Sequence, residues 1–379
     1  MKRTVCIFMV VAVLCCLLPV SAGAVEVAGK SALLMDVTTG TVLYAKNEHE
    51  RLHPASVTKV MTMLLIMEAI DGGTLSWTDT VTASANAAAK GGSQIYLKEN
   101  ETMSVEEMVK SIAVSSANDC ACAMAEHLAG SEEAFVEKMN ARAAQLGMED
   151  THFVNCTGLD DSPEAKEHLT SAHDIALMSR QLLKFHPEIK RFTTIWMDTV
   201  RGGAFGLSNT NKLVRFYDGA TGLKTGFTAA AGYCLSASAM REGMELVAVV
   251  MGCDSSKERF DACRKLLDHG FAAYTLAQPK LEGEVYVPVE LGQQPLVQAV
   301  AGSEEALLID KTHKASLVTD ITLDESVKAP VSKGQRLGTL TLRAGERVLV
   351  QVPLVAAQAV NKLTFGQIFL QLLQKLCMG

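Results

Sequence analysis

The spacing of apolar and polar residues changes several times along the chain, and each change predicts a different kind of element. Residues 31–47 contain two apolar-rich runs on either side of a Thr-Thr-Gly turn at 38–40, which is typical of a β-hairpin. A second apolar run begins after Pro54, continues to Ile70 and stops at Gly72. Proline before the start and glycine after the end predict a buried helix of about four turns.

The middle of the chain changes from helical spacing to strand spacing. Helical stretches occupy 105–114, 119–128 and 132–146, which predicts an all-helical subdomain. Three strand-like runs follow between 219 and 253, and residues 257–276 have the pattern of one more helix. Strands, then helices, then strands favour an α+β fold with an antiparallel sheet over a parallel βαβ series.

A different pattern begins near residue 278. Residues 281–356 form short alternating runs with turn residues about every ten positions, which predicts a small all-β domain, a sandwich. We therefore place a first domain at 25–277 and a β domain at 278–357.

The tail, residues 358–379, carries helical spacing with one apolar face. Its apolar positions are Phe365, Ile368, Phe369, Leu372, Leu373 and Leu376. Such a helix is too short and too polar to span a bilayer, so we expect it to attach the protein peripherally to a membrane surface. The alternative is that it docks onto the β domain or onto a second copy of the chain.

The N-terminus has the pattern of an export signal. Lys2 and Arg3 precede an almost purely apolar stretch at 5–20, and small residues follow at 21–24. This predicts a signal peptide at 1–24, cleaved after Ala24, and a mature protein on the outer face of the cytoplasmic membrane. An uncleaved anchor is the alternative.

Composition and charge narrow the class of protein. The chain has 379 residues, of which 48% are hydrophobic and 20% charged, so it can bury a large core and form two domains. The net charge of -7 and the lack of a basic stripe argue against nucleic-acid binding. The cysteines form no disulfide framework, and no Cys/His set has zinc-site spacing, so we expect no metal and no cofactor.

Ser56 and Lys59 form the only Ser-x-x-Lys in the chain. At the start of a helix, positions i and i+3 share one face, so the lysine amine can reach the serine hydroxyl. The lysine can act as a base only if burial or a second cation lowers its pKa. Taken alone, the pattern also fits a helix cap next to a solvated charge.

Lys224, Thr225 and Gly226 form a Lys-Thr-Gly run inside a predicted strand. Lys224 could supply the second cation, Thr225 a hydroxyl for a substrate carboxylate, and Gly226 room for a ligand at the strand edge. An ordinary strand lysine beside a bulge glycine is the alternative.

Ser-x-Asn occurs at Ser84 to Asn86 and at Ser116 to Asn118. We choose Ser116 and Asn118, because they lie between two predicted helices where a loop can be held over a cleft.

The three motifs together, in this order, make up the set used by penicillin-recognising serine enzymes. The stretches PASVTKVMT, SSANDCACAMAEHLA, FVNCTGLDD, HLTSAHDIALMSR and GATGLKTGFTAAAGYCLSASA resemble low-molecular-mass penicillin-binding proteins of the serine D-Ala-D-Ala carboxypeptidase family. The resemblance runs from about Ser31 to the end and is nearest to Gram-positive enzymes, some of them linked to sporulation. It implies removal of the terminal D-Ala from peptidoglycan stem pentapeptides, a part in cell-wall maturation and cell shape, and covalent inhibition by β-lactams.

The resemblance also implies catalytic roles for named residues. Ser56 would be the acylated nucleophile and Lys59 its base. Ser116 would pass a proton to the leaving D-Ala, Asn118 would bind the substrate amide, and Lys224 would set the electrostatics.

Further roles concern the substrate's carboxylate and the oxyanion. Thr225 and Arg259 would hold the terminal carboxylate, and the backbone N–H groups of Ser56 and Phe227 would form the oxyanion hole. A surface charge on a helix is the alternative for Arg259. We interpret Asn155, Gly158, His168 and Asp174, which also match family positions, as loop and helix-start structure, and we do not expect His168 to be a base.

Two other functions are open from the sequence alone. A class A-like β-lactamase has the same motifs but needs a loop glutamate for fast deacylation, and residues 150–175 offer Glu164 and Glu167 without that pattern. A non-catalytic wall-binding scaffold is the alternative from another class. It is disfavoured because all three motifs are intact.

Overall fold

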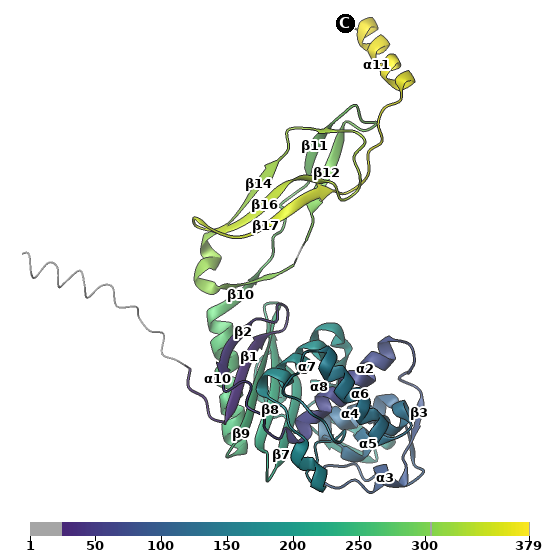
Figure 1. Ribbon diagram of the computed structural model, residues 1–379, viewed down its shortest axis with the longest axis vertical. Coiled ribbons are helices and arrows are strands. Elements are labelled where there is room, and N and C mark those ends of the chain that lie inside the picture. Colours follow the sequence, from purple (N-terminus) through teal and green to yellow (C-terminus); the bar gives the residue numbers. More distant parts are fainter. Residues whose placement is uncertain (1–24, 304, 379) are drawn as a thin grey trace, which may run out of the picture.

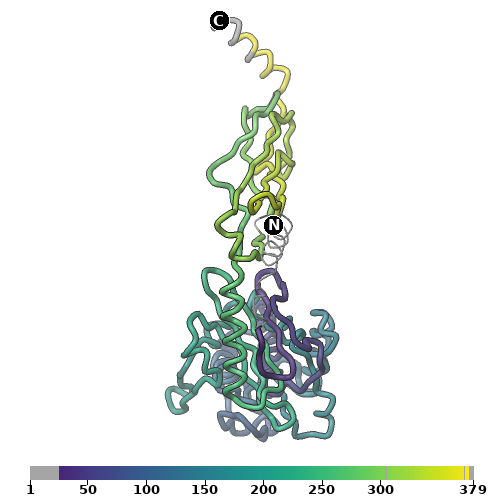
Figure 2. Tube along the Cα trace, turned by 90° about the vertical axis from the view of Figure 1, so that its left-hand side faces the viewer, coloured from purple at the N-terminus to yellow at the C-terminus, as the bar shows by residue number. Residues whose placement is uncertain are grey.

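The computed structural model describes residues 25–303 and 305–378 (Figure 1). The predicted signal peptide at 1–24 lies outside the described residues. The chain forms two parts, a mixed α/β region at one end and a β-rich region that extends from it (Figures 1 and 2). This arrangement confirms the predicted α+β fold class followed by an all-β region.

A five-stranded antiparallel sheet is the centre of the first region. Its strand order is β2-β1-β9-β8-β7. The strands are β1 (Ser31–Asp36), β2 (Val42–Lys46), β7 (Ala220–Thr228), β8 (Gly232–Arg241) and β9 (Met244–Cys253). The predicted hairpin and the three predicted strands are confirmed, and β7 is left as an edge strand of this sheet.

Helices cover both faces of the sheet (Figure 1). The longer ones are α2 (Lys59–Asp71), α4 (Val105–Ser115), α5 (Asn118–Ala129), α6 (Glu132–Gln145), α7 (Ala172–Phe185) and α10 (Ser256–Ala273). On β1, Leu33 packs with α2 and α7, whereas Leu34 packs with α10. This alternation follows from the period of two in a strand and divides the core into two layers.

Short elements complete the first region. They are the 3-10 turns η1 (Ala55–Thr58), η2 (Pro163–Glu167), η3 (Pro187–Ile189) and η4 (Arg201–Gly203), the helices α3 (Ala85–Ala88), α8 (Lys190–Thr193) and α9 (Leu213–Phe216), and the strand pairs β3 (Thr80–Thr82) with β4 (Thr102–Ser104) and β5 (Met197–Val200) with β6 (Phe205–Ser208).

Two predicted helix boundaries were wrong. The helix expected after Pro54 opens with the 3-10 turn η1, and its α-helical part begins only at Lys59. The helix expected over 257–276 ends at Ala273, because the following residues form strand β10 (Tyr274–Ala277), which pairs with β13 (Leu307–Asp310). An aromatic and a β-branched residue at 274 and 275 favour that extended backbone.

The β-rich region contains a six-stranded sheet with the order β14-β16-β17-β12-β11-β15. The strands are β11 (Val285–Glu290), β12 (Leu296–Ala301), β14 (Leu317–Leu323), β15 (Val327–Lys328), β16 (Arg336–Ala344) and β17 (Arg347–Ala356), with the 3-10 turn η5 (Lys311–Ser316) before β14. Its own core is small and aliphatic, centred on Val287, Val297, Leu340 and Leu354.

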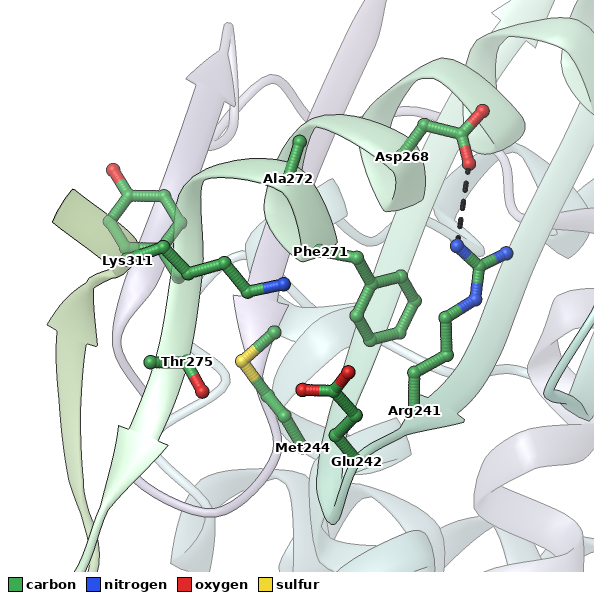
Figure 3. Close-up of a pocket in the computed structure, with 9 residues that line it drawn as sticks. Arg241, Glu242, Met244, Asp268, Phe271, Ala272, Thr275 and Lys311 are labelled. Atoms are coloured by element: carbon green, nitrogen blue, oxygen red, sulfur yellow. Dashed lines mark ion pairs between the residues drawn. The ribbon is translucent and has the colours of Figure 1, made fainter. Parts of the chain in front are cut away.

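A cavity of about 330 Å³ lies where the two regions meet (Figure 3). Arg241 and Phe271 line it from the first region and Lys311 lines it from the β-rich region. The Arg241 guanidinium lies 4.8 Å from the centre of the Phe271 ring and 3.9 Å from the Asp268 carboxylate. The cavity is therefore lined by charged and aromatic side chains together with Met244 and Ala272. Leu276 and Leu308 at the same junction pack against the core of the first region.

Helix α11 (Phe365–Met378) stands at the end of the β-rich region that is farthest from the sheet of the first region (Figure 1). Most of its described apolar side chains are exposed, with Phe365 at 85% and Leu370 at 60%, and Ile368 is half-buried. They do not dock onto the β-rich region in this structure. Among the described helices, none is both long enough and apolar enough to cross a bilayer.

Candidate active site

The turn η1 and the start of α2 bring Ser56 and Lys59 together, as the spacing of the motif predicts. Lys59 Nζ donates a hydrogen bond to Ser56 Oγ at 2.9 Å and another to the carbonyl of Thr157 at 2.7 Å. Lys59 is fully buried, whereas Ser56 is partly exposed. The amine is thus held from inside the protein against a hydroxyl that a ligand can reach.

Burial changes the chemistry of Lys59. An ammonium group loses its hydration inside a protein, which favours the neutral amine. Burial accordingly lowers the pKa of Lys59 from 10.5 to about 7. Near neutral pH a large fraction of the side chain is then uncharged, and its lone pair can accept the proton of the Ser56 hydroxyl.

A second buried lysine lies on β7. Lys224 Nζ donates to Ser116 Oγ at 2.9 Å and to the carbonyl of Thr225 at 2.9 Å. Burial lowers the pKa of Lys224 well below its usual value, and the charges of Lys59 and Arg259 lower it further. Burial is the main cause of the lowered pKa of Lys59, and the idea that Lys224 lowers it as a second cation stays a prediction.

Ser116 ends α4 in a left-handed conformation, with φ of 63°. This bend separates α4 from α5, so Ser116 and Asn118 lie in the short connection between two helices, as we expected. The other Ser-x-Asn has a structural role, because Ser84 Oγ accepts a hydrogen bond from the N–H of Ala87 and caps α3.

Asn118 holds the neighbouring loop. Its Nδ2 donates to the carbonyl of Gly91 at 2.7 Å, and its backbone N–H donates to the carbonyl of Ser93. Its Oδ1 is buried and has no partner among the described residues. A buried acceptor without a partner is costly, so this oxygen could take an N–H from a bound peptide.

Gly226 lets strand β7 close against the nucleophile turn. A Cβ atom at this position would lie 2.5 Å from the carbonyl oxygen of Pro54 and 3.1 Å from the backbone nitrogen of Val57. The glycine is therefore required by the approach of the strand to η1. Room for a ligand, which we had inferred from the same glycine, stays a prediction.

The remaining predicted residues of β7 differ in exposure, because Thr225 is buried and Phe227 is exposed. Thr225 Oγ1 donates to Thr210 Oγ1 at 2.7 Å. Phe227 is 54% exposed, and its ring centre lies 4.3 Å from that of Tyr233. β7 is an edge strand, and edge strands can bind an extended peptide through their backbone.

Arg259 is not a surface charge, so that alternative was wrong. Only 8% of the residue is exposed, and Nη1 donates to the carbonyl of Gly226 at 2.9 Å. Its Nε is buried without a partner among the described residues. The guanidinium therefore lies directly behind the Lys-Thr-Gly strand.

The family-matching residues outside the three motifs are structural, as we expected. His168 is buried, its Nδ1 accepts from the N–H of Val154, and its Nε2 lies 2.8 Å from Thr58 Oγ1. Burial lowers the pKa of His168 to about 3, so the ring stays neutral.

The others are also held in loop and helix-start contacts. Asn155 Oδ1 accepts from the N–H groups of Thr157 and Gly158, and Asp174 accepts from the N–H of Asp150 at the start of α7. A Cβ at Gly158 would lie 1.9 Å from the carbonyl of Ala55.

Thr157 and Thr210 are contacts of the site that we did not predict. The carbonyl of Thr157 anchors Lys59 from 98 positions away, and any residue type could supply that carbonyl. A backbone acceptor therefore leaves no side-chain signal in a sequence. Within the described residues, no cluster of three or more His, Cys, Asp or Glu side chains could hold a metal ion.

Comparison with known proteins gives consistent matches over both regions. Residues 19–255 match the D-alanyl-D-alanine carboxypeptidase family, and residues 274–362 match the C-terminal domain of penicillin-binding protein 5. D-alanyl-D-alanine carboxypeptidase DacF of Bacillus subtilis is 43% identical over 342 residues, which cover 89% of this chain and 87% of that protein. DacD of Escherichia coli is 34% identical, over 91% of this chain and 90% of its own length.

Solved structures agree with these matches. Penicillin binding protein 5 from Haemophilus influenzae superimposes with a TM-score of 0.74 at 29% identity, over 90% of this chain and all of that one. Penicillin-binding protein D2 from Listeria monocytogenes, solved in the ampicillin-bound form, superimposes with a TM-score of 0.60 at 32% identity, over 65% of this chain and 99% of that one.

Proposed function

This chain belongs to the D-alanyl-D-alanine carboxypeptidase family, and on that premise we propose that Ser56 is the nucleophile with which it opens the terminal D-Ala-D-Ala bond of peptidoglycan stem peptides. The protein is a serine-type carboxypeptidase, a hydrolase. The single observation that supports the role of Ser56 best is the contact of its hydroxyl with a fully buried amine whose pKa is about 7.

Acylation begins when neutral Lys59 accepts the proton of Ser56 Oγ, which attacks the carbonyl carbon of the penultimate D-Ala. The oxyanion that forms accepts hydrogen bonds from the backbone N–H groups of Ser56 and Phe227, and one such donor stabilises the transition state by about 3 kcal/mol. Ser116, which contacts Lys224, passes a proton to the leaving D-Ala nitrogen. Water then hydrolyses the acyl-enzyme.

The substrate lies along the edge of β7 in this proposal. Thr225 and Arg259 hold the terminal carboxylate, Gly226 leaves the strand flat, and Asn118 binds the peptide amide. Burial of the Arg259 guanidinium behind β7 supports the carboxylate assignment, because a charge attracts an anion more strongly inside a protein than it does in water.

Penicillin provides the direct test. We expect a labelled penicillin to form an adduct on Ser56 that turns over slowly, with the modified peptide identified by mass spectrometry. Ser56→Ala should give no adduct while its Tm stays unchanged. An adduct on another residue, or one that Ser56→Ala does not remove, would refute the assignment of the nucleophile.

The alternative functions are not favoured. Every relative named above is a carboxypeptidase or a penicillin-binding protein. Glu164 and Glu167, the candidates for a β-lactamase glutamate, are exposed on or beside η2. Fast turnover of bound penicillin would favour the β-lactamase assignment over the carboxypeptidase.

Export and membrane attachment complete the proposal. We assign 1–24 to a cleaved signal peptide, 25–277 to the catalytic domain and 278–357 to the β domain. Of the tail at 358–379, Val360 is buried in the core of the β-rich region, and we assign α11 (Phe365–Met378) to the outer face of the cytoplasmic membrane. Exposure of Phe365 and Leu370 on α11 supports the last assignment, because a solvent-exposed apolar face gains free energy by entering a bilayer surface.

A further inference from the structure

Two buried thiols share one carboxylate behind the active site. Cys122 lies on α5, Cys156 lies in the loop that follows β-bridge residue His152, and Glu132 begins α6. The Cys122 thiol donates to Glu132 Oε2 at 3.6 Å, and the Cys156 thiol donates to Glu132 Oε1 at 3.2 Å. Both thiols are fully buried, and they contact the two oxygen atoms of one carboxylate group.

The carboxylate between them is held firmly. Lys90 Nζ donates to Glu132 Oε2 at 2.6 Å, and the N–H of Cys156 donates to Oε1 at 3.2 Å. Burial alone would raise the pKa of Glu132, but the hydrogen bond and charge of Lys90 outweigh it and keep the pKa below its usual value. Glu132 is therefore ionised, and it fixes the positions of both sulfur atoms.

Cys156 is directly coupled to the catalytic lysine. The next residue along the chain is Thr157, whose carbonyl accepts the hydrogen bond from Lys59. The carbonyl of Cys156 itself accepts from Thr62 Oγ1 at 2.6 Å, one turn along the same helix α2. A displacement of Cys156 must therefore move the group that holds Lys59 against Ser56.

We propose that Cys122 and Cys156 are a redox-active dithiol, which an external disulfide converts to a Cys122–Cys156 disulfide, and that this bond slows acylation of Ser56. The conversion is a thiol–disulfide exchange. One thiolate attacks the external disulfide and releases one thiol, and the second then attacks the mixed disulfide and releases the other. Two cysteines are oxidised, and the external disulfide is reduced to two thiols that take up the two protons.

The location of the protein makes this reaction possible, and this step rests on the proposed function. An enzyme of cell-wall peptides works outside the cytoplasm, where thiols are not kept reduced. Burial also raises the pKa of Cys156, which makes the thiolate rare in the folded state. Closure is therefore expected to be slow in the folded protein and faster while the chain is folding.

The bond would replace the contacts of both thiols with Glu132. A disulfide needs sulfur atoms about 2.05 Å apart, so Cys156 must move toward α5. The Thr157 carbonyl then moves away from Lys59 Nζ. Losing one hydrogen bond to the base should slow acylation about tenfold, which corresponds to about 1.4 kcal/mol in the barrier.

The test uses the full chain, refolded once with dithiothreitol and once with excess glutathione disulfide, followed by alkylation of free thiols. We expect mass spectrometry of the oxidised sample to identify a peptide that links Cys122 and Cys156. We also expect acylation by a labelled penicillin to be about tenfold slower than in the reduced sample, and dithiothreitol to restore it.

Two single-residue variants test whether the Cys122–Cys156 pair causes the effect of oxidation. Cys122→Ala should make acylation insensitive to glutathione disulfide. Cys120→Ala removes another buried thiol from the same helix and should respond to oxidation as the parent does. The parent alone, oxidised and then reduced again, gives the answer if a variant fails to fold.

Two outcomes would overturn the proposal: alkylation of both thiols after oxidation, or a disulfide that leaves the acylation rate unchanged. Neither outcome bears on the nucleophile. A failure of the proposed function would appear in the reduced sample, as absence of a Ser56 adduct.

Discussion

The catalytic region and the β-rich region differ in what they bury. In the part of the chain that the structure describes, every buried polar or charged side chain precedes residue 276, and among them are Lys59, Lys224 and Arg259. The described residues after that point bury only hydrophobic side chains, around Val287 and Leu354. One region buries three basic side chains in its core, and the other has an aliphatic core.

The difference shows which region carries chemistry. Burying a cation costs free energy that its hydrogen bonds only partly offset, so an ordinary folding core avoids it. A catalytic lysine, in contrast, needs that burial, because burial is what lowers its pKa. The β-rich region has no such feature in its described residues, and its elongated position suits a spacer between the catalytic region and α11 (Figure 1).

The largest expected effect comes from removing the buried amine. Lys59→Met keeps a side chain of similar length but has no base, so we expect acylation by labelled penicillin to fall about 10³-fold. We expect Tm to change little, because the two hydrogen bonds that are lost are offset by the removal of a buried polar amine. Lys333→Met changes an exposed lysine of the β-rich region and should alter neither quantity. Acylation within tenfold of the parent would show that Lys59 is not the base.

The next effect tests how tightly the loop fits against the nucleophile turn. Gly158→Ala would place a Cβ 1.9 Å from the Ala55 carbonyl, so we expect a loss of about 3 kcal/mol in the free energy of unfolding, with slower acylation. Gly147→Ala is the control, because that glycine also has a positive φ but no atom within 4 Å of the added Cβ. Chemical denaturation measures both. Equal losses would mean that strain at positive φ, and not the contact with η1, decides the stability.

A pH-dependent effect on stability should appear in acid. The pKa of His168 is about 3 in the folded protein and 6.5 for an ordinary histidine. Between these two pH values the imidazole is protonated in the unfolded chain but neutral in the folded one. The stability from the neutral ring is complete above pH 6.5 and is lost as the pH falls toward about 3, by up to about 1.4 kcal/mol per pH unit.

His168→Gln should therefore flatten the fall of the unfolding free energy over that range. The exposed His127 provides the control, as His127→Gln should leave the slope unchanged. If the slope of His168→Gln equals that of the parent, the ring is not buried in its neutral form.

The smallest effect on catalysis is expected at the far end of the molecule. Deletion of residues 364–379 removes α11 and keeps the buried Val360, so the protein should leave the membrane fraction. Its activity on a soluble peptide should be unchanged within about twofold, because α11 lies at the opposite end of the molecule from β7 and α2 (Figure 1). Fractionation and peptide hydrolysis are the measurements. Continued association with membranes would assign the attachment to another surface.

The parts of the fold and site that follow from short-range patterns could be predicted from the sequence. The strands of the sheet and the helices α4 to α6 have clear periods, and Ser56 with Lys59 needs only one helical turn. The Thr157 anchor, the burial of Arg259 and the closure of Gly158 on Ala55 could not be predicted in the same way. Each depends on residues about a hundred positions apart, or on a backbone atom that every residue type has.

The pH dependence of acylation tests the role of Lys59 most directly. The second-order rate constant for a labelled penicillin should be constant above about pH 8 and should fall about tenfold per pH unit below a midpoint near 7, where Lys59 becomes protonated. A rate that does not change between about pH 6 and about pH 9, or a midpoint near the ordinary lysine pKa of 10.5, would contradict a buried neutral Lys59 as the base for Ser56.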